Sequence, residues 1–195
     1  MKKAQKLHSK NASKTISKTR ISSGFLKNKT IDSPSGNIIH PMGARERMAL
    51  LNIIGPSIID KTVLDIFAGT GAIGIEALSR GASFVTFVEK NPKVASVLKN
   101  NLKLLGLEKV SRVITTSAEK FLAEFTSETF DFIIADPPYD KIKEINPEVF
   151  NFLSKKANES FILSHPGDFD SKQIDAHLIS TRKYAAAHIS LFTKS

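Results

Sequence analysis

The chain has 195 residues, 41% of them hydrophobic, and this size and composition suit one soluble domain with a sizeable core. No apolar run approaches the roughly 18 residues needed to cross a bilayer, and no secretory signal is recognisable, so we expect a cytoplasmic protein that does not contact membranes. The absence of cysteine excludes disulfides, thiolate metal sites and a cysteine nucleophile.

The net charge of +9 is concentrated near the N-terminus. Residues 1–31 contain nine Lys and Arg residues and no acid, whereas the rest of the chain has 19 basic and 19 acidic residues. A cationic arm, expected at 1–18, is typical of nucleic-acid binders because lysine and arginine displace counterions from phosphates. The alternatives are a disordered solubilising tail and a transit peptide, and the single Arg among many Lys disfavours the latter.

Two elements are expected between the arm and the main domain. Residues 21–41 contain two short β-like pieces around a Ser/Pro/Gly turn, and residues 43–55 have the pattern of a helix. Together they form a small element at 19–60, ahead of a domain at 61–195.

From residue 61 onward, short apolar runs alternate with longer segments of helical period. Strands are expected at 62–67, 84–90, 111–116, 130–135 and 160–165. Helices are expected at 72–80, 92–105, 118–125 and 147–156. This alternation predicts a doubly wound α/β domain with a mostly parallel sheet, and two last strands at 177–184 and 187–193 suit an antiparallel hairpin at its edge.

A glycine-rich turn follows the first strand of this domain. In DIFAGTGAIG, Gly69, Gly71 and Gly74 have G-x-G-x-x-G spacing between a strand and a helix, so a ligand can approach the backbone and the N–H groups of the helix N-terminus. Glu89, twenty residues after Gly69, ends the next strand, where a carboxylate can accept hydrogen bonds from ribose hydroxyls. These features together predict a nucleoside-containing cofactor.

Asp65, just before the turn, favours one class of cofactor. Dinucleotide-binding folds share the glycine pattern, but the negative charge of Asp65 would not stabilise a bound pyrophosphate. The same charge would stabilise the positively charged ammonium and sulfonium groups of S-adenosylmethionine. Structural alternatives stay open for both acids. Asp65 would then cap the turn through its own backbone, and Glu89 would be an exposed strand-end acid beside Lys90.

The fourth strand ends in the motif DPPY. Ligands of open α/β sheets bind at the carboxyl ends of the strands, so Asp136 is expected to face the same crevice as the glycine turn. Pro137 and Pro138 stiffen the loop, which leaves the Asp136 carboxylate and the Pro137 carbonyl as fixed acceptors, with the Tyr139 ring at the rim. This arrangement suits an exocyclic amine on a planar base, and the alternative is a structural turn with an incidental acid.

Such an amine could be methylated by direct displacement, through positioning and electrostatics, without a covalent intermediate or a metal. The five histidines show no metal-ligand spacing. His165, after the fifth strand, is expected to be structural or solvent-facing rather than a catalytic base.

These motifs resemble those of a known enzyme family. DIFAGTGAIGIEALSRGASFVTFVEKN resembles motif I and the acidic strand of class I S-adenosylmethionine-dependent methyltransferases, and DPPY resembles their amino-methyltransferase motif IV. The order of these motifs and the residues in them are most similar to those of the RsmD family, which methylates guanine N2 in bacterial 16S rRNA. TRISSGFLKNKTI, HPMGARERM and RKYAAAHISLF extend the resemblance, which covers about residues 19–193.

The resemblance implies a Rossmann-like fold and transfer of a methyl group from S-adenosylmethionine to a guanine N2 in 16S rRNA of the small ribosomal subunit. We further expect a monomer that needs no metal. The cofactor-binding residues that the resemblance implies are Asp65, Phe67, Ala68, Gly69, Gly71, Glu89, Lys90, Ser117 and Ala118. The catalytic residues that it implies are Asp136, Pro137, Pro138 and Tyr139.

RNA contact is expected from the arm and from the element at 19–60. The candidate residues are Lys14, Lys18, Arg20, Arg45 and Arg47. For Arg45 and Arg47 the alternative is a pair of surface arginines bonded to Glu46 or other acids.

Three positions depart from the family pattern: His40 replaces Arg, Ser117 replaces Asp, and the alanines at 185–187 replace Gly-x-Thr. Two other functions stay open. DPPY suits a DNA adenine-N6 methyltransferase equally well, and a non-catalytic RNA-binding module could keep the fold. The acids at 65, 89 and 136 argue against the second, because binding alone does not need them together.

Overall fold

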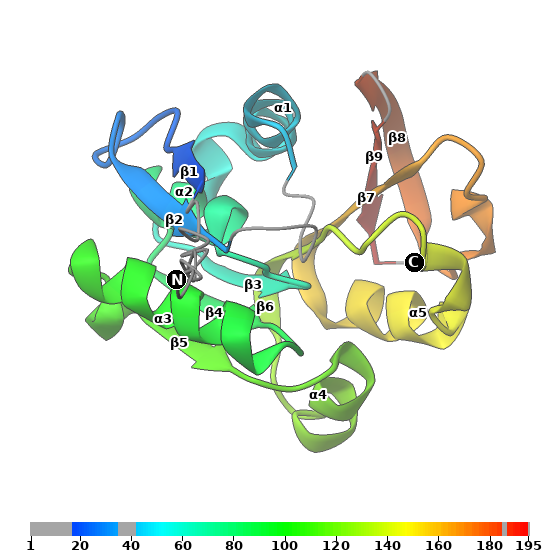
Figure 1. The fold of residues 1–195 in the computed structure, drawn as a ribbon. Coiled ribbons are helices and arrows are strands. Elements are labelled where there is room, and N and C mark those ends of the chain that lie inside the picture. The colour runs from blue at the N-terminus through cyan, green and yellow to red at the C-terminus, as the bar shows by residue number, and fades with distance from the viewer. Residues whose placement is uncertain (1–16, 35–41, 185–186, 195) are drawn as a thin grey trace, which may run out of the picture.

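The computed structural model describes residues 17–34, 42–184 and 187–194. A seven-stranded sheet crosses the molecule in the order β5-β4-β3-β6-β7-β9-β8 (Figure 1). Its parallel strands are β3 (Thr62–Ile66), β4 (Phe84–Val88), β5 (Ser111–Ile114), β6 (Phe130–Ala135) and β7 (Ala157–Pro166). β8 (His177–Tyr184) and β9 (Ala187–Thr193) add an antiparallel hairpin beside β7. The predicted fold class and its C-terminal hairpin are confirmed.

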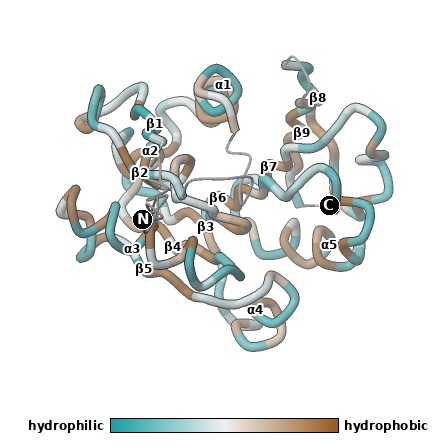
Figure 2. Tube along the Cα trace, in the orientation of Figure 1, coloured by the Kyte–Doolittle hydropathy of each residue, from teal (hydrophilic) through white to brown (hydrophobic). Residues whose placement is uncertain are grey.

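Helices cover both faces of the sheet, as a doubly wound fold requires. α1 (Ala44–Ile54), α2 (Ala72–Ser79) and α3 (Pro92–Leu104) pack on one face, and α4 (Ala118–Glu124) and α5 (Pro147–Lys156) on the other. Each face has its own apolar core cluster. In Figure 2 hydrophobic residues follow the central strands, while the helices alternate between hydrophobic and hydrophilic stretches.

Short 3₁₀ helices occur in the connections between these elements. They are η1 (Gly55–Ile58), η2 (Glu108–Val110), η3 (Ile142–Glu144) and η4 (Ser171–Gln173). Among the residues that the structure describes, no helix has the length and apolar character needed to cross a membrane.

The register of the central strands brings three chain segments to one edge. Ile66, the last residue of β3, pairs with Val88 of β4 on one side and with Ala135 of β6 on the other. The residues that follow these three therefore leave the sheet side by side. Because the strands are parallel, the glycine turn, Glu89 and the DPPY motif share this edge.

Local signals fix where α3 begins and ends. The Asn91 side chain accepts hydrogen bonds from the backbone N–H groups of Lys93 (3.0 Å) and Val94 (3.5 Å), and Pro92 is the first helical residue. Gly106 follows the C-terminus with a φ of +70°, a conformation that glycine adopts without strain. The predicted caps of this helix are confirmed.

A separate two-stranded sheet precedes the main domain. β1 (Ser17–Arg20) pairs antiparallel with β2 (Thr30–Ser33), so the first strand includes Lys18, which we had assigned to the arm. The chain reverses between these two strands at residues 21–29, where Gly24 (φ +77°) and Asn28 (φ +71°) adopt the left-handed backbone that the reversal needs. The predicted Ser/Pro/Gly turn continues past Pro34 into residues outside the described ranges. The second predicted piece falls on residues 35–41, outside the described ranges.

Candidate cofactor and base site

The glycine turn connects β3 to α2 through several left-handed residues. Phe67 (φ +70°), Gly69 (φ +56°) and Gly71 (φ +83°) all have positive φ. The turn is closed by a hydrogen bond from the Gly71 N–H to the Ala68 carbonyl (2.8 Å). An aromatic residue in this conformation is strained, and such strain is concentrated at ligand sites.

The glycines also permit close packing behind the turn. A Cβ on Gly71 would lie 2.2 Å from Cδ1 of Leu98, and one on Gly74 would lie 2.3 Å from the ring of Phe87. Gly74 therefore lets α2 approach β4 closely, and Gly71 leaves room for the Leu98 side chain of α3. This packing sets the place of the helix N-terminus, whose N–H groups are the predicted anion or ligand contact.

Asp65 is almost fully buried beneath the turn, with 1% of its surface exposed. Its Oδ2 accepts a hydrogen bond from the Gly74 N–H at 2.9 Å, so the capping role that we considered as an alternative is present. Burial raises its pKa well above the ordinary 3.8, and the charges of Asp136 and Glu89 raise it further, against the effect of the Gly74 bond. Asp136 and Glu89 therefore lie close enough to Asp65 to disfavour its ionised form.

Glu89 bonds both to the glycine turn and to the connection between β4 and α3. Its Oε2 accepts from the Gly69 N–H (3.0 Å) and its Oε1 from the Asn91 N–H (2.7 Å). Each carboxylate oxygen has another lone pair to offer. Glu89 is thus partly buried and oriented by the backbone, not a free strand-end acid, whereas its neighbour Lys90 is exposed.

Ser117 and Ala118 lie at the start of α4, beyond the carboxyl end of β5. The Ser117 hydroxyl caps this helix by accepting a hydrogen bond from the Lys120 N–H at 3.3 Å, and Ala118 is buried. Serine can make this cap in place of the aspartate of the family pattern. Whether these residues contact a cofactor is untested and stays a prediction.

The DPPY motif leaves β6 at the predicted edge. Asp136 and Tyr139 are partly buried, Pro137 is buried and Pro138 is exposed. Burial raises the pKa of Asp136 from 3.8 to about 6, so its carboxyl group is largely ionised at neutral pH and can still exchange a proton there. Burial likewise raises the pKa of Tyr139 to about 12, which keeps the phenol neutral.

Ser164 is a site residue that the motifs did not indicate. It is fully buried on β7, and its Oγ lies 2.6 Å from the Tyr139 hydroxyl. The Ser164 hydroxyl lowers the pKa of both Asp136 and Tyr139, against the effect of burial. A serine hydroxyl can donate to a carboxylate while it accepts from a phenol, so Ser164 can join the two ends of the motif. The sequence feature that could have indicated Ser164 is its position near the carboxyl end of the predicted strand at 160–165.

His165 next to it is not part of this site. Only 2% of it is exposed, and its ring nitrogens lie 2.8 Å from the Pro166 carbonyl and 2.8 Å from Oγ of Ser190. Burial lowers its pKa, which favours the neutral ring. Of the two roles that we expected for His165, the structural one is observed.

Comparison with known proteins identifies the family. Residues 19–191 match the family described as Conserved hypothetical protein 95. YlbH of Bacillus subtilis, named as a candidate rRNA methyltransferase, is 31% identical over 181 residues, which are 90% of this chain and 98% of that protein. The chain belongs to the RsmD family. The family resemblance of the motifs is thereby confirmed.

Other members and structures agree with this assignment. Ribosomal RNA small subunit methyltransferase D of Escherichia coli is 35% identical over 120 residues, or 62% of this chain and 60% of that protein. The solved structure of a hypothetical protein from Thermus thermophilus has a TM-score of 0.74 at 28% identity, and covers 91% of this chain and 99% of that chain. The RsmD-family fold therefore extends over nearly the whole chain.

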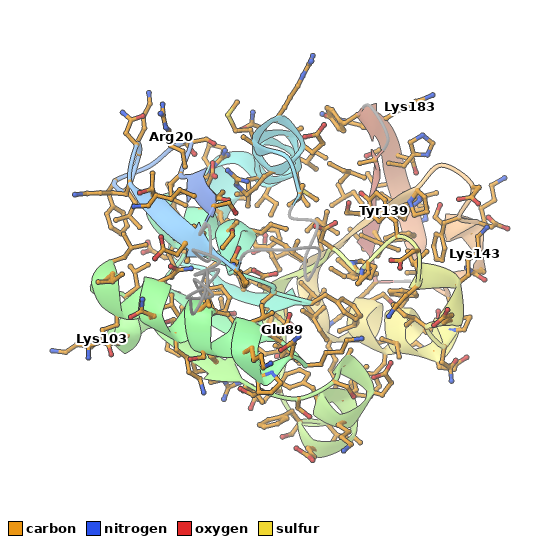
Figure 3. The ribbon with its side chains drawn as sticks, viewed as in Figure 1. Arg20, Glu89, Lys103, Tyr139, Lys143 and Lys183 are labelled. Carbon is orange, nitrogen blue, oxygen red and sulfur yellow. The ribbon has the colours of Figure 1, made fainter. Side chains whose placement is uncertain are left out.

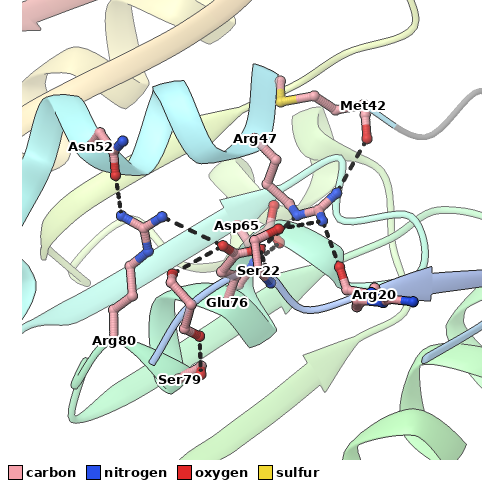
Figure 4. Close-up of polar contacts among 11 residues, drawn as sticks. Arg20, Ser22, Met42, Arg47, Asn52, Asp65, Glu76, Ser79 and Arg80 are labelled. Carbon is pink, nitrogen blue, oxygen red and sulfur yellow. Dashed lines mark hydrogen bonds and ion pairs between the residues drawn. The ribbon is translucent and has the colours of Figure 1, made fainter. Parts of the chain in front are cut away.

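One predicted RNA contact in this RsmD-family protein is wrong. Arg47 is fully buried, as is its partner Glu76, and its Nε donates to Glu76 Oε2 at 2.8 Å (Figure 4). The other guanidinium nitrogens donate to the carbonyls of Arg20 (2.9 Å) and Met42 (3.3 Å) and to the Ser22 hydroxyl (3.5 Å). Its charge is neutralised inside the protein, so Arg47 holds the N-terminal hairpin against α2 and does not face phosphates.

The remaining predicted RNA contacts are exposed where the structure describes them. Lys18 and Arg20 project from β1, and Arg45 lies in the first turn of α1. Lys14 lies outside the described residues, as do His40 and two of the three alanines at 185–187. For these exposed cations, RNA contact stays a prediction.

Proposed function

We propose that this chain transfers a methyl group from S-adenosylmethionine to the exocyclic N2 of a guanine in 16S rRNA of the small ribosomal subunit. The observation that carries the proposal is that Asp65, Glu89 and the Asp136 motif meet at one edge of the sheet beside the glycine turn. Membership of the RsmD family and the rRNA methyltransferase names of its relatives support rRNA as the substrate class.

The acids at this edge fit a cationic nucleoside cofactor. Burial and mutual repulsion raise the pKa of Asp65, and the described residues supply it with no ion-pair partner. S-adenosylmethionine would supply an electrophilic methyl group together with positive charge near these acids. Asp65 orients the turn through Gly74, and Glu89 offers its carboxylate to ribose hydroxyls while the Gly69 N–H holds it in place. The residues present therefore fit this cofactor.

Asp136 and Pro137 are the groups that would hold the amine. The ionised carboxylate and the backbone carbonyl each accept one hydrogen, which directs the nitrogen lone pair toward the methyl donor. With a pKa of about 6, the Asp136 carboxyl group can also take the proton that the amine must lose after methylation and release it to water. Tyr139, at the end of the same motif, would stack on the plane of the base; Figure 3 labels it and Glu89.

The first test is cofactor binding and methyl transfer. Isothermal titration should show binding of S-adenosylmethionine, and labelled cofactor should methylate undermethylated small subunits but not duplex DNA. Absence of binding at millimolar cofactor would refute the enzyme proposal. Label that entered DNA alone would favour the adenine-N6 alternative instead.

The second test separates catalysis from folding. Asp136→Ala should abolish transfer and leave cofactor binding largely intact, because the lost carboxylate contacts the amine. Asp140→Ala changes an exposed acid four residues later and should retain activity. Near-normal turnover of Asp136→Ala would remove this residue from the mechanism.

The third test concerns RNA affinity. A chain that lacks residues 1–16 loses five lysines and retains β1. Each lost phosphate contact should weaken RNA binding and flatten its dependence on salt. An unchanged salt dependence would mean that these lysines do not contact RNA.

A further inference from the structure

Phe25, in the loop between β1 and β2, is exposed to an unusual degree. Its side chain is 69% exposed. The other large apolar residues exposed among those described are Met48, Ile59, Leu104, Val110 and Ile179, which are all aliphatic. Single exposed aliphatic residues are ordinary, whereas an exposed aromatic ring is a typical binding element.

The backbone around Phe25 is fixed to the end of α2. The Phe25 N–H donates to the Ser79 carbonyl (2.8 Å), and the Leu26 N–H donates to Ser79 Oγ (2.9 Å). Ser79 Oγ in turn donates to the Ser23 carbonyl (2.6 Å). A Cβ on Gly24 would lie 1.7 Å from the Ser79 carbonyl oxygen, so the loop lies directly against the helix end.

These contacts show that the ring is held in solvent by an ordered loop. Leu26, the next residue, is only 6% exposed and anchors the loop in the core. The sequence therefore buries one apolar side chain of this pair and presents the other. A preorganised ring loses little conformational entropy when it binds a partner.

Four exposed cationic side chains lie on the same hairpin as the exposed ring. Lys18, Arg20, Lys27 and Lys29 are all exposed on this hairpin. Asp32 is the one acid in residues 17–34, and its backbone N–H is bonded to Asn101. The hairpin thus combines an aromatic face with cations and almost no acid, which matches the chemistry of single-stranded nucleic acid.

We propose that Phe25 is a stacking site for an unpaired RNA base, with Lys27 and Lys29 placed to contact the phosphates on either side. The proposal rests on the proposed function only in taking RNA as the substrate. Every base offers a π-face to an aromatic ring, so this contact adds affinity without selecting a sequence. A protein partner would gain little from one ring surrounded by lysines, since interface cores are depleted of lysine.

The stacking site lies away from the site that would hold the target base. Ser79, which holds this loop, is the last residue of α2, whereas the glycine turn precedes the N-terminus of the same helix. Figure 3 labels Arg20, at the start of the loop, well apart from Tyr139. The base that stacks on Phe25 is therefore not the base that is methylated. The contact would position a large RNA by a second point of attachment.

Phe25→Trp gives a direct test, because the chain contains no tryptophan. In the full chain the new indole would be the sole tryptophan, and stacking of a base should quench its fluorescence. An RNA stem–loop with an unpaired loop should quench it strongly, and the fully paired duplex should not. Equal quenching by both RNAs, or by neither, would overturn the proposal.

Affinity measurements on Phe25→Ala provide the second test. Loss of one stacked base should weaken stem–loop binding by about 5- to 150-fold, with the salt dependence unchanged. Lys27→Ala and Lys29→Ala should instead reduce the salt slope by about one each. Leu104→Ala removes an equally exposed apolar side chain (70%) elsewhere and is the matched control, expected to bind like the wild type.

Three outcomes would contradict stacking. The first is a Phe25→Ala variant that binds the stem–loop as tightly as the wild type. The second is full affinity in Phe25→Leu, which would show that apolar area and not the aromatic face matters. The third is a loss seen with whole small subunits and absent with naked RNA, which would assign the surface to a ribosomal protein.

Methyl transfer distinguishes this inference from the proposed function. If both hold, Phe25→Ala should raise KM for the RNA substrate and keep kcat and cofactor affinity. A wild-type chain that transfers no methyl group would refute the proposed function, while the binding comparison would still decide whether Phe25 stacks. An active wild type with an unaffected Phe25→Ala variant would refute the stacking site alone.

Discussion

The Asp136 carboxyl group should reduce the stability of the protein at neutral pH. Burial raises its pKa from 3.8 to about 6, which means that folding disfavours the ionised form. Asp136→Asn keeps the size and hydrogen-bonding capacity of the side chain and removes the charge. We therefore expect the variant to be inactive and more stable than the wild type.

The rise in pKa sets the magnitude of this effect. A change from 3.8 to about 6 corresponds to about 3 kcal/mol when the group is ionised in both the folded and the unfolded state. Asp136 remains partly accessible to water, so we expect about 2 kcal/mol in practice. Removal of this charge should also lower the pKa of Asp65, which acts in the same direction.

The pH dependence follows from the sign of the shift. Below pH 3.8 the carboxyl group is protonated in both the folded and the unfolded state, so Asp136 does not destabilise the wild type. The destabilisation develops as the pH rises from 3.8 and is complete above about 6. The advantage of Asp136→Asn should therefore be largest above about pH 7 and shrink toward pH 4.

Urea unfolding followed by circular dichroism at several pH values measures this difference. Asp140→Asn is the control, and its stability should change by less than about 0.5 kcal/mol, because Asp140 is exposed. An Asn variant that is no more stable than the wild type at neutral pH would refute the reasoning. A gain that did not depend on pH would show that the charge is not its source.

Three further variants test other parts of the structure. Arg47→Ala should lower the free energy of unfolding in urea by about 3–5 kcal/mol because it leaves a buried Glu76 unpaired, whereas exposed Arg45→Ala should have little effect; equal effects would contradict the buried pair. Gly74→Ala should cost about 1–3 kcal/mol, since its Cβ would lie 2.3 Å from an aromatic ring, and unchanged thermal unfolding would contradict that packing. Glu89→Gln should weaken cofactor binding in titration calorimetry by about tenfold or more, and wild-type affinity would argue against a ribose contact.

The sequence was sufficient for the regular elements and for the edge where the site lies. Buried parallel strands such as β3 are mostly apolar, and glycine or proline marks the boundaries of the elements, so both signals are local. The glycine turn and DPPY were placed correctly because parallel strands bring successive carboxyl ends to one edge.

The position of Arg47 depended on tertiary structure. Arg45 and Arg47 look alike in the sequence, but residues two apart lie on opposite faces of a helix. Arg47 begins the stripe that continues with Leu50, Leu51 and Ile54, all buried. The helical period alone therefore puts Arg47 on the inner face of α1. What the sequence does not show is the acid partner that permits its burial, because Glu76 comes from α2.

The hairpin turn and Ser164 could not be derived from local pattern. The loop at 21–29 is held by hydrogen bonds to Ser79, which lies more than 50 residues later and which no local turn signal indicates. Ser164 is one of many serines, and its role depends on the register of β7 beside β6. Both features arise from contacts between segments distant in the sequence.

The short helix α2 connects the glycine turn to the loop that carries Phe25. Its eight residues span about 12 Å, with the cofactor turn at the N-terminus and Ser79, which holds the Phe25 loop, at the C-terminus. Glu76, midway along, is fastened to the hairpin through Arg47. A chain shortened to begin at residue 61 would leave Glu76 without its Arg47 partner, so it should be less stable than the full chain. The Phe25 loop and the glycine turn are thus attached to opposite ends of one helix.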